Sequence, residues 1–156
     1  MTFDELRTEI KAANLVLVGI GEDLHGDMDG FYRSLAGLLD KKDYFVVTLQ
    51  DREGLVQAGI FGEQITAPFS EGEPQESWDK YLHWLSFTLH QKLCVLELGV
   101  GFLKPEVIRF PFEKTSYFNQ KSRYIRINET FPQLSAEIAD RGISIKENPV
   151  DFLTES

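Results

Sequence analysis

The sequence predicts an α/β domain built on a doubly wound parallel sheet of about five to six strands, with helices on both faces. Short, continuous apolar runs such as Leu15-Val16-Leu17-Val18 suit strands that are buried on both sides, as the strands of parallel sheets are. Segments with apolar residues at helical spacing lie between these runs, and strands that alternate with helices indicate a parallel sheet. The 156 residues show no repeat and no domain boundary, so we expect a single domain over residues 1–156.

The individual elements are predicted from local signals along the chain. Thr2 and Glu5 form a capping box, because each side chain can satisfy a free backbone N–H at the start of the first helix. Pro68 confines a minor strand at 65–69 to an edge of the sheet, since proline donates no ladder hydrogen bond. Ser77 is expected to cap a long helix. The other strands are predicted at 15–18, 44–47, 93–96, 124–127 and 143–145. Further helices are predicted at 31–39, 54–58 and 132–140. One more helix is expected to begin at Pro105, with Pro111 as its limit or kink, and a last one to begin at Pro149.

Composition and charge exclude several classes of function. Lys and Arg number 16 and Asp and Glu number 25, which gives a formal net charge of −9. This field repels a phosphate backbone, which argues against nucleic-acid binding. Cys94 is the single cysteine, so an intrachain disulfide and a cysteine-cluster zinc site are excluded. No apolar run reaches the ~20 residues of a membrane helix, and the N-terminus lacks the layout of a secretion signal. We expect a soluble, cytoplasmic protein without a membrane partner.

Glycine-rich turns follow two of the predicted strands. In an open parallel sheet, ligands bind beyond the carboxyl ends of the strands. Gly19-Ile20-Gly21 and Gly99-Val100-Gly101 lie at such ends, and Asn128 follows another strand as a candidate ribose partner. Glycine lets a phosphate approach backbone N–H groups closely, which favours a nucleotide site. The alternative is that these glycines end buried strands for steric reasons alone.

Polar residues near the first turn suggest other chemistry. Glu22, Asp23, Asp27 and Asp29 crowd this turn, and carboxylates disfavour a neighbouring pyrophosphate. Residues 25–30 resemble the start of a calcium-binding loop, but the first and last ligand positions of such a loop do not match this sequence. We therefore expect a solvated acidic loop and no metal site. His25 is a weak candidate for a general base and is otherwise a surface histidine.

Five stretches of the chain share residues with one known family. The most specific is 96–113, which starts Leu-Glu-Leu-Gly-Val-Gly-Phe and ends Val-Ile-Arg-Phe-Pro-Phe-Glu. The others are 17–21, 44–48, 57–59 and 124–128, and they come in the family's order. Together these stretches resemble the sirtuins, in the divergent bacterial branch that is associated with macrodomain proteins.

The resemblance implies a sirtuin-like, Rossmann-like three-layer domain that binds NAD, ADP-ribose or a related adenine nucleotide. Sirtuins use NAD to remove acyl groups from lysine or to transfer ADP-ribose. The implied cofactor-binding residues are Gly19 and Gly21 at the phosphates, Gly99, Val100 and Gly101 on the adenosine side, Asn128 at a ribose, and Gln50 at a position where the family has asparagine.

The sequence also departs from the sirtuin pattern. In one register of the stretch after the second strand, Gln50 and Arg52 occupy the family's Asn and Asp positions, whereas a shift by one residue places Asp51 and Glu53 there. No histidine lies at 65–70, where the catalytic one is expected, and the four-cysteine zinc module is missing. Loss of a positioned base forfeits about 10²–10⁴ in rate. We therefore expect neither lysine deacylation nor zinc.

Four functions remain open from the sequence. The first is a binding module for NAD, ADP-ribose or a related nucleotide. The second is residual NAD hydrolysis or ADP-ribosyl transfer, with Asp51 or Glu53 as acid or base. The third is S-adenosylmethionine binding through 95–101, which lacks the third glycine of that motif because Leu103 stands there. The fourth is a ligand-free structural or interaction protein, with a homodimer through aromatic residues at 110–112.

Overall fold

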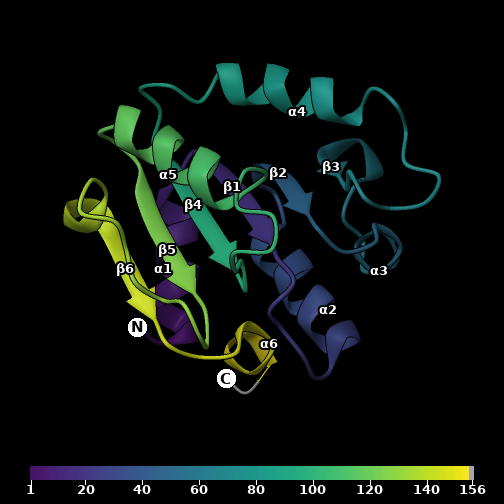
Figure 1. Ribbon diagram of the computed structural model, residues 1–156, viewed down its shortest axis with the longest axis horizontal. Helices are drawn as coiled ribbons and strands as arrows, with labels where there is room; N and C mark the ends of the chain where they lie inside the picture. Colours follow the sequence, from purple (N-terminus) through teal and green to yellow (C-terminus); the bar gives the residue numbers. More distant parts are fainter. Residues whose placement is uncertain (155–156) are drawn as a thin grey trace.

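The computed structural model describes residues 1–154 and contains a parallel sheet between two layers of helices (Figure 1). Within these residues the sheet has six strands in the order β3-β2-β1-β4-β5-β6. Every neighbouring pair is parallel. The strand order reverses between β1 and β4, which is the topological switch point of the fold. The predicted doubly wound parallel sheet is confirmed. The strands are β1 (Leu15–Ile20), β2 (Asp43–Thr48), β3 (Ile65–Thr66), β4 (Leu93–Leu98), β5 (Arg123–Ile127) and β6 (Gly142–Ile145).

Helices cover both faces of the sheet and divide the core into two layers. The α-helices are α1 (Phe3–Ala12), α2 (Met28–Leu39), α3 (Glu53–Gln57), α4 (Ser77–Ser86), α5 (Arg109–Phe118) and α6 (Pro149–Thr154), and short 3-10 helices lie at Gly62–Gln64 and Ala139–Arg141. Val16 and Val18 of β1 pack in the layer with α1, α2 and α6, whereas Leu17 packs in the layer with α4 and α5. Successive strand residues point to opposite faces, so a fully apolar strand serves both layers.

Several local signals in the sequence have the expected structural effect. The Thr2 hydroxyl accepts the Glu5 N–H at 3.2 Å, and the Glu5 carboxylate accepts the Thr2 N–H at 3.1 Å, as in a capping box. The short strand β3 pairs with β2 alone and forms one edge of the sheet. At the start of α6, the Asn148 side chain accepts the Val150 N–H at 3.3 Å. Local capping chemistry therefore predicts these boundaries correctly.

The helix expected at 132–140 is absent, and only the 3-10 turn at Ala139–Arg141 forms there. Residues 132–135 instead have no regular structure and residues 136–138 form a turn, and carbonyl groups at the start of this segment accept hydrogen bonds from arginine side chains. Arg126 donates to the Gln133 carbonyl at 2.6 Å, and Arg109 donates to the Phe131 carbonyl at 3.2 Å. Because side chains from β5 and α5 satisfy this backbone, it does not need helical hydrogen bonds.

Two other helix boundaries differ from the prediction. Ser77 is the first residue of α4 and not its cap, and its hydroxyl bonds Thr66 at 2.9 Å. The helix expected from Pro105 begins only at Arg109. Pro111 lies in the first turn of α5, where the missing N–H of proline breaks no intrahelical bond. The structure therefore moves both starts without removing either helix.

A buried ion pair connects β4 to β5 beneath α5. Glu97 and Arg126 are both fully buried, with Arg126 Nε 2.6 Å from Glu97 Oε2 and Nη2 2.8 Å from Oε1. Arg126 also contacts Glu113 of α5 at 2.7 Å, and the Tyr124 hydroxyl donates to Glu97. Burial alone would lower the pKa of Arg126, but the hydrogen bonds and the charge of Glu97 outweigh it and raise the pKa. Arg126 therefore stays charged, and its hydrogen bonds to Glu97 hold the two strands together.

Replacing Arg126 with methionine is expected to destabilise the fold by about 3–5 kcal/mol, because buried Glu97 loses both hydrogen bonds from Arg126 and keeps only Arg109, at 4.0 Å, as a neighbouring cation. The measurement is urea unfolding at neutral pH. Arg123 provides a matched control on the same strand, since its ion pair with Glu9 at 3.1 Å is exposed. Arg123→Met is expected to cost less than about 1 kcal/mol. Equal losses in the two variants would contradict the assignment.

Candidate functional site

The two glycine turns meet at the switch point of the sheet. The first turn follows β1 and contains Gly21, and the second turn follows β4 and contains Gly99, Val100 and Gly101. A Cβ built on Gly21 would lie 2.3 Å from the carbonyl oxygen of Gly99 and 2.4 Å from the Cα of Val100. The Gly21 N–H donates to the Leu98 carbonyl at 2.9 Å. Gly99 has a φ of +64°, which favours glycine, and a Cβ there would lie 2.6 Å from the Asp23 carbonyl oxygen. Direct contact between the turns therefore requires glycine on both sides.

Gln50 and Asn128 flank these turns and fix their carbonyl groups. Gln50 Nε2 donates to the Gly21 carbonyl at 2.9 Å, and Asn128 Nδ2 donates to the Val100 carbonyl at 2.9 Å. Asn128 is fully buried, and its side-chain oxygen accepts two backbone N–H groups at 2.9 and 2.8 Å. The structure thus brings most of the predicted cofactor-binding residues to one edge, namely Gly21, Gln50, Gly99, Val100, Gly101 and Asn128.

Gly19 lies apart from this edge. It is inside β1, and a Cβ built on it would lie 2.6 Å from both the Ile108 and the Phe112 side chains. The missing side chain makes room for the start of α5 against the sheet. For Gly19, the steric explanation of the glycines is the one that the structure supports.

A carboxylate from the first turn binds the second turn. The Gly101 N–H donates to Glu22 Oε1 at 3.0 Å, and the Leu103 N–H donates to Glu22 Oε2 at 2.9 Å. Glu22 is half-buried, and Asp27 caps α2 by accepting the Gly30 N–H at 3.0 Å. The expectation of a solvated acidic loop is therefore wrong for Glu22, whereas Asp27 remains exposed to solvent while it caps α2. The sequence signal for Glu22 was its place directly after Gly21.

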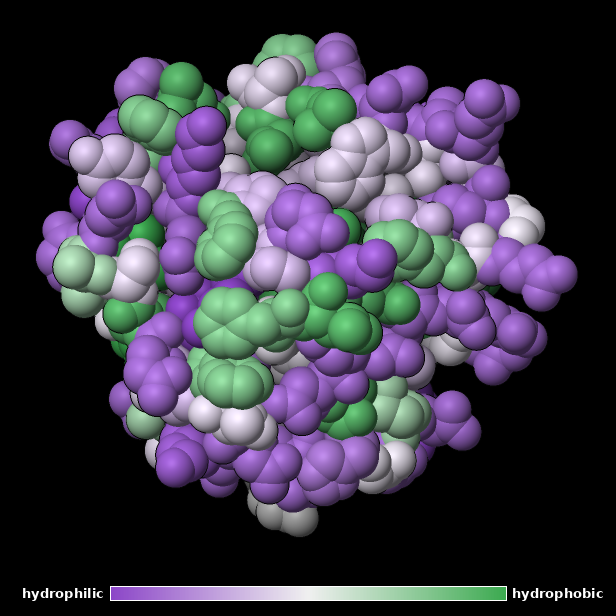
Figure 2. Space-filling model, viewed as in Figure 1, coloured by the Kyte–Doolittle hydropathy of each residue, from purple (hydrophilic) through white to green (hydrophobic). Residues whose placement is uncertain are grey.

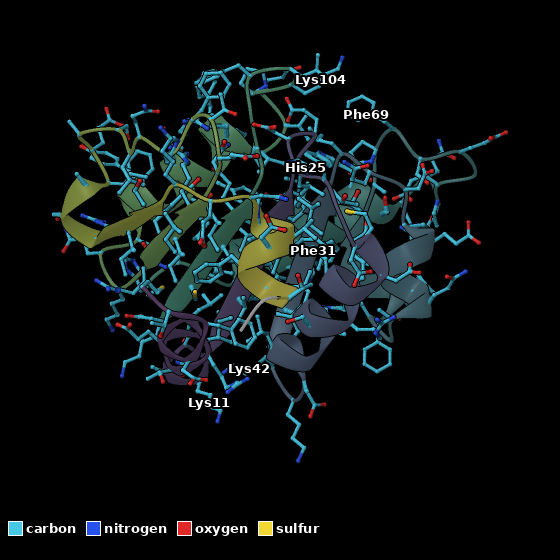
Figure 3. All side chains as sticks on the ribbon, turned by 90° about the horizontal axis from the view of Figure 1, so that it is seen from below. Lys11, His25, Phe31, Lys42, Phe69 and Lys104 are labelled. Carbon is cyan, nitrogen blue, oxygen red and sulfur yellow. The ribbon has the colours of Figure 1, made fainter. Side chains whose placement is uncertain are left out.

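His25 lies at the same edge but is not held as a catalytic base would be. Its Nε2 is 3.1 Å from Glu129 Oε2, and both side chains are largely exposed. Its backbone is fixed by Asn148, whose Nδ2 donates to the His25 carbonyl at 2.6 Å. Figure 3 shows His25, Phe69 and Lys104 toward one end of the molecule and Lys11 and Lys42 toward the other. The histidine thus belongs to the exposed rim of this edge.

The stretch after β2 presents Gln50 to the first turn and sends its charged residues elsewhere. Arg52 donates to the carbonyls of Gly62 and Ile65 at 3.0 and 2.9 Å and pairs with Glu73. Asp51 and Glu53 are exposed. The candidate acid or base residues therefore do not join Gln50 at the contact between the turns.

The loop at 70–76 is anchored by one partly buried carboxylate. Glu73 lies 2.6 Å from Arg52 Nε and accepts the Ala67 N–H at 2.9 Å. Partial burial alone would raise the pKa of Glu73, but the hydrogen bonds from Arg52, Ala67 and Ser77 and the charge of Arg52 outweigh it and lower the pKa. Glu73 therefore holds the loop against the end of β3 in its ionised form.

Aromatic side chains surround the second turn. The Phe102 and Phe131 rings meet edge to face at 5.1 Å, and the Arg109 guanidinium lies 4.4 Å from the centre of the Phe102 ring. Lys104 lies 5.1 Å from the centre of the Phe69 ring, which links this loop to the one after β3. These rings are partly exposed, and Figure 2 shows that apolar side chains interrupt the polar surface on one face of the molecule.

Features outside this edge offer little chemistry. Cavities of about 500 Å³ beside α4 and about 350 Å³ between α1 and the starts of β4 and β5 lie away from the switch point. Burial raises the pKa of the Cys94 thiol to about 12, as expected for a core cysteine. Within residues 1–154, no three His, Cys, Asp or Glu residues gather as metal ligands. Over the same residues, no helix has the length and apolar character needed to cross a membrane.

Comparison with solved structures identifies the fold as sirtuin-like. One matching structure, from a study of sirtuin substrate affinity, has a TM-score of 0.64 and 9% identity over 99% of this chain and 98% of its own. A Sir2 structure with a p53 peptide and NAD+ has a TM-score of 0.61 and 11% sequence identity, and the match covers 99% of this chain and 97% of the Sir2 chain. A third structure, from work on the mechanism and regulation of Sir2 enzymes, has a TM-score of 0.58 and 12% identity, and the match covers 97% of this chain and 96% of that one. No protein-family model and no curated protein match the chain.

Replacing Gly21 with alanine is expected to destabilise the fold by about 1–3 kcal/mol or more, because the added Cβ collides with backbone and not with a movable side chain. Thermal or urea unfolding measures the loss. The control is Gly37→Ala on the exposed side of α2, where nothing lies within 4 Å of the added Cβ. That variant is expected to gain about 0.5–1 kcal/mol. A Gly21 variant as stable as the control would contradict the close contact.

Replacing Glu73 with glutamine is expected to cost about 1–3 kcal/mol at pH 7, through loss of its charged hydrogen bonds. A lowered pKa in the folded state gives stability that is complete above the unfolded pKa of about 4.3 and is lost as pH falls through the folded value. The difference in the free energy of unfolding between the parent protein and Glu73→Gln should therefore shrink below about pH 4. Glu71→Gln, an exposed change in the same loop, is the control. A pH-independent difference would argue against this anchor.

Proposed function

We propose that this chain is a single sirtuin-like domain that binds NAD, ADP-ribose or a related adenine nucleotide at the switch point between β1 and β4. One observation carries the proposal. Two backbone N–H groups of the second turn already bind an anion, the Glu22 carboxylate, at the edge where ligands bind in open parallel sheets. The NAD-bound Sir2 structure with a similar fold supports the ligand class.

We further propose that the domain does not remove acyl groups from lysine. The segment 65–70, where the resemblance places the catalytic base, reads Ile-Thr-Ala-Pro-Phe-Ser. None of these side chains accepts a proton near neutral pH. His25 lies on the exposed rim with Glu129 and is not held against the turns. Binding without this chemistry is the function that these residues support.

The residues do not fit the pyrophosphate of NAD as they lie in this structure. Gly21 touches Gly99 and Val100, so no space for a phosphate separates the turns. The Glu22 carboxylate takes the two N–H groups that a phosphate would need, and like charges repel at this distance. Both polar atoms of the Asn128 amide have protein partners. Binding therefore requires the Glu22 side chain to release these two N–H groups, and we derive no catalytic step through NAD.

A second candidate function is a ligand-free interaction domain. The closed turns favour it, and so do the partly exposed aromatic rings around the second turn. Phe110 is 53% exposed and could meet a second copy of the chain. Phe112, which the sequence placed in the same surface, is fully buried against the sheet and cannot. A binding measurement with adenine nucleotides separates the two candidates.

Replacing Gly101 with alanine is expected to weaken nucleotide binding about tenfold or more, because the added methyl group occupies the anion position. A Cβ there would lie 3.0 Å from Glu22 Oε2, the movable end of a side chain, so the fold should tolerate it. Isothermal titration calorimetry with NAD, ADP-ribose and AMP measures the change in Kd. A tenfold increase in Kd corresponds to a loss of about 1.4 kcal/mol of binding free energy.

The control for this experiment is again Gly37→Ala, which should bind as the parent protein does. No binding of any adenine nucleotide to the parent protein would reject the proposed function in favour of the interaction domain. Binding that is equal in the parent and the Gly101 variant would place the ligand elsewhere on the molecule.

A further inference from the structure

We propose that Glu22 is an internal anion that occupies the phosphate position of the nucleotide site and makes binding there depend on the charge of the ligand. This inference rests on the proposed function and explains why the residues do not fit a pyrophosphate as they lie. The anion-binding turn is defined here as residues 101–103, whose N–H groups at Gly101 and Leu103 hold the carboxylate.

The geometry of the contact is that of a bound ligand. Each oxygen of one carboxylate accepts one backbone N–H, at 3.0 and 2.9 Å, from a turn that lies 79 and 81 residues further along the chain. A phosphate group offers the same pair of neighbouring acceptors. The turn does not begin a helix, because α5 starts only at Arg109. The anion-binding turn is therefore a property of the backbone between β4 and α5.

The surroundings of the turn favour an anion over a neutral group. Lys104 directly follows it, and the buried Arg109 guanidinium donates to the Val100 carbonyl at 2.8 Å on the preceding residue. Cationic groups therefore lie along the same loop in a chain whose net charge is −9. A displaced Glu22 would remain beside Asp23, so its carboxylate also repels the anion that replaces it. Both effects make Glu22 a competitor of anionic ligands.

The contact between Glu22 and the anion-binding turn is the part of this edge that can be exchanged for a ligand. Asn128 is fully buried, and Gly21 is fixed by backbone contact, so neither can leave without unfolding. Glu22 is half-buried and its side chain can rotate to solvent. When the competent state is only partly populated, apparent affinity falls by that fraction. The inference predicts weak binding of phosphates to the parent protein and an unchanged affinity for a neutral nucleoside.

The test compares Glu22→Gln with Asp23→Asn by calorimetry at low ionic strength and pH 7.5. Both variants lose one negative charge from the same loop, but only Glu22 contacts the anion-binding turn. Inorganic pyrophosphate, adenosine and NAD are the probes. Glu22→Gln should bind pyrophosphate about tenfold more tightly than the parent protein does, whereas Asp23→Asn should change it by less than about twofold, since the half-buried Asp23 side chain lies outside the contact with the anion-binding turn and its charge is partly screened by water. Affinity for adenosine should stay the same in both.

Amide hydrogen exchange supplies a second measurement that does not depend on any ligand. The Gly101 and Leu103 N–H groups should exchange faster in Glu22→Gln and at the parent rate in Asp23→Asn. Equal behaviour of the two variants, in exchange or in pyrophosphate binding, would overturn the inference. A gain in pyrophosphate binding without any binding of NAD or adenosine would uphold the role of Glu22 and reject the adenine nucleotide as ligand.

Discussion

The edge of the sheet depends on the contact between Gly21 and the backbone of Gly99 and Val100. Parallel strands at a switch point diverge into helices on opposite faces, and the turns that leave them normally separate. Here the two turns touch, because neither carries a Cβ at the point of contact. The contact brings the start of the first turn, with Glu22, over the second one. The hydrogen bonds from Gly101 and Leu103 to Glu22 follow from this placement.

The sequence predicted the layered sheet well because burial on both faces leaves a strong local pattern. The apolar runs of β1, β2 and β4 and the proline-limited edge strand β3 were all recognisable without tertiary information. The ion pair of Glu97 and Arg126 was not recognisable in this way. Each residue places a charge inside an apolar strand, and burial of that charge is tolerated only because its partner lies beside it. Arg126 and Arg109 also donate to the carbonyl groups of residues 131 and 133, where the sequence predicts the start of a helix over 132–140. These hydrogen bonds come from other elements, so the pattern of the segment itself gives no sign of them.

The candidate site was predictable in its position and not in its state. Glycines after two strands, together with Gln50 and Asn128, predict one shared edge, and the structure brings them together because the carboxyl ends of parallel strands meet there. A glycine inside a strand and a glycine after it look alike in the sequence, and the packing of Ile108 and Phe112 shows that Gly19 is of the first kind. The contact of Glu22 joins residues 79 positions apart, so the place of Glu22 directly after Gly21 does not reveal which groups it binds.

A turn that binds a ligand and a turn that only closes a fold use the same backbone groups. In this chain Gln50 and Asn128 satisfy the carbonyl groups of the edge, and Glu22 satisfies its N–H groups. The first two contacts fix the shape of the turns. In the proposed function, the contact of Glu22 fills the position that an anion takes. Nucleotide binding at this edge is then a competition between one carboxylate and a phosphate for two N–H groups.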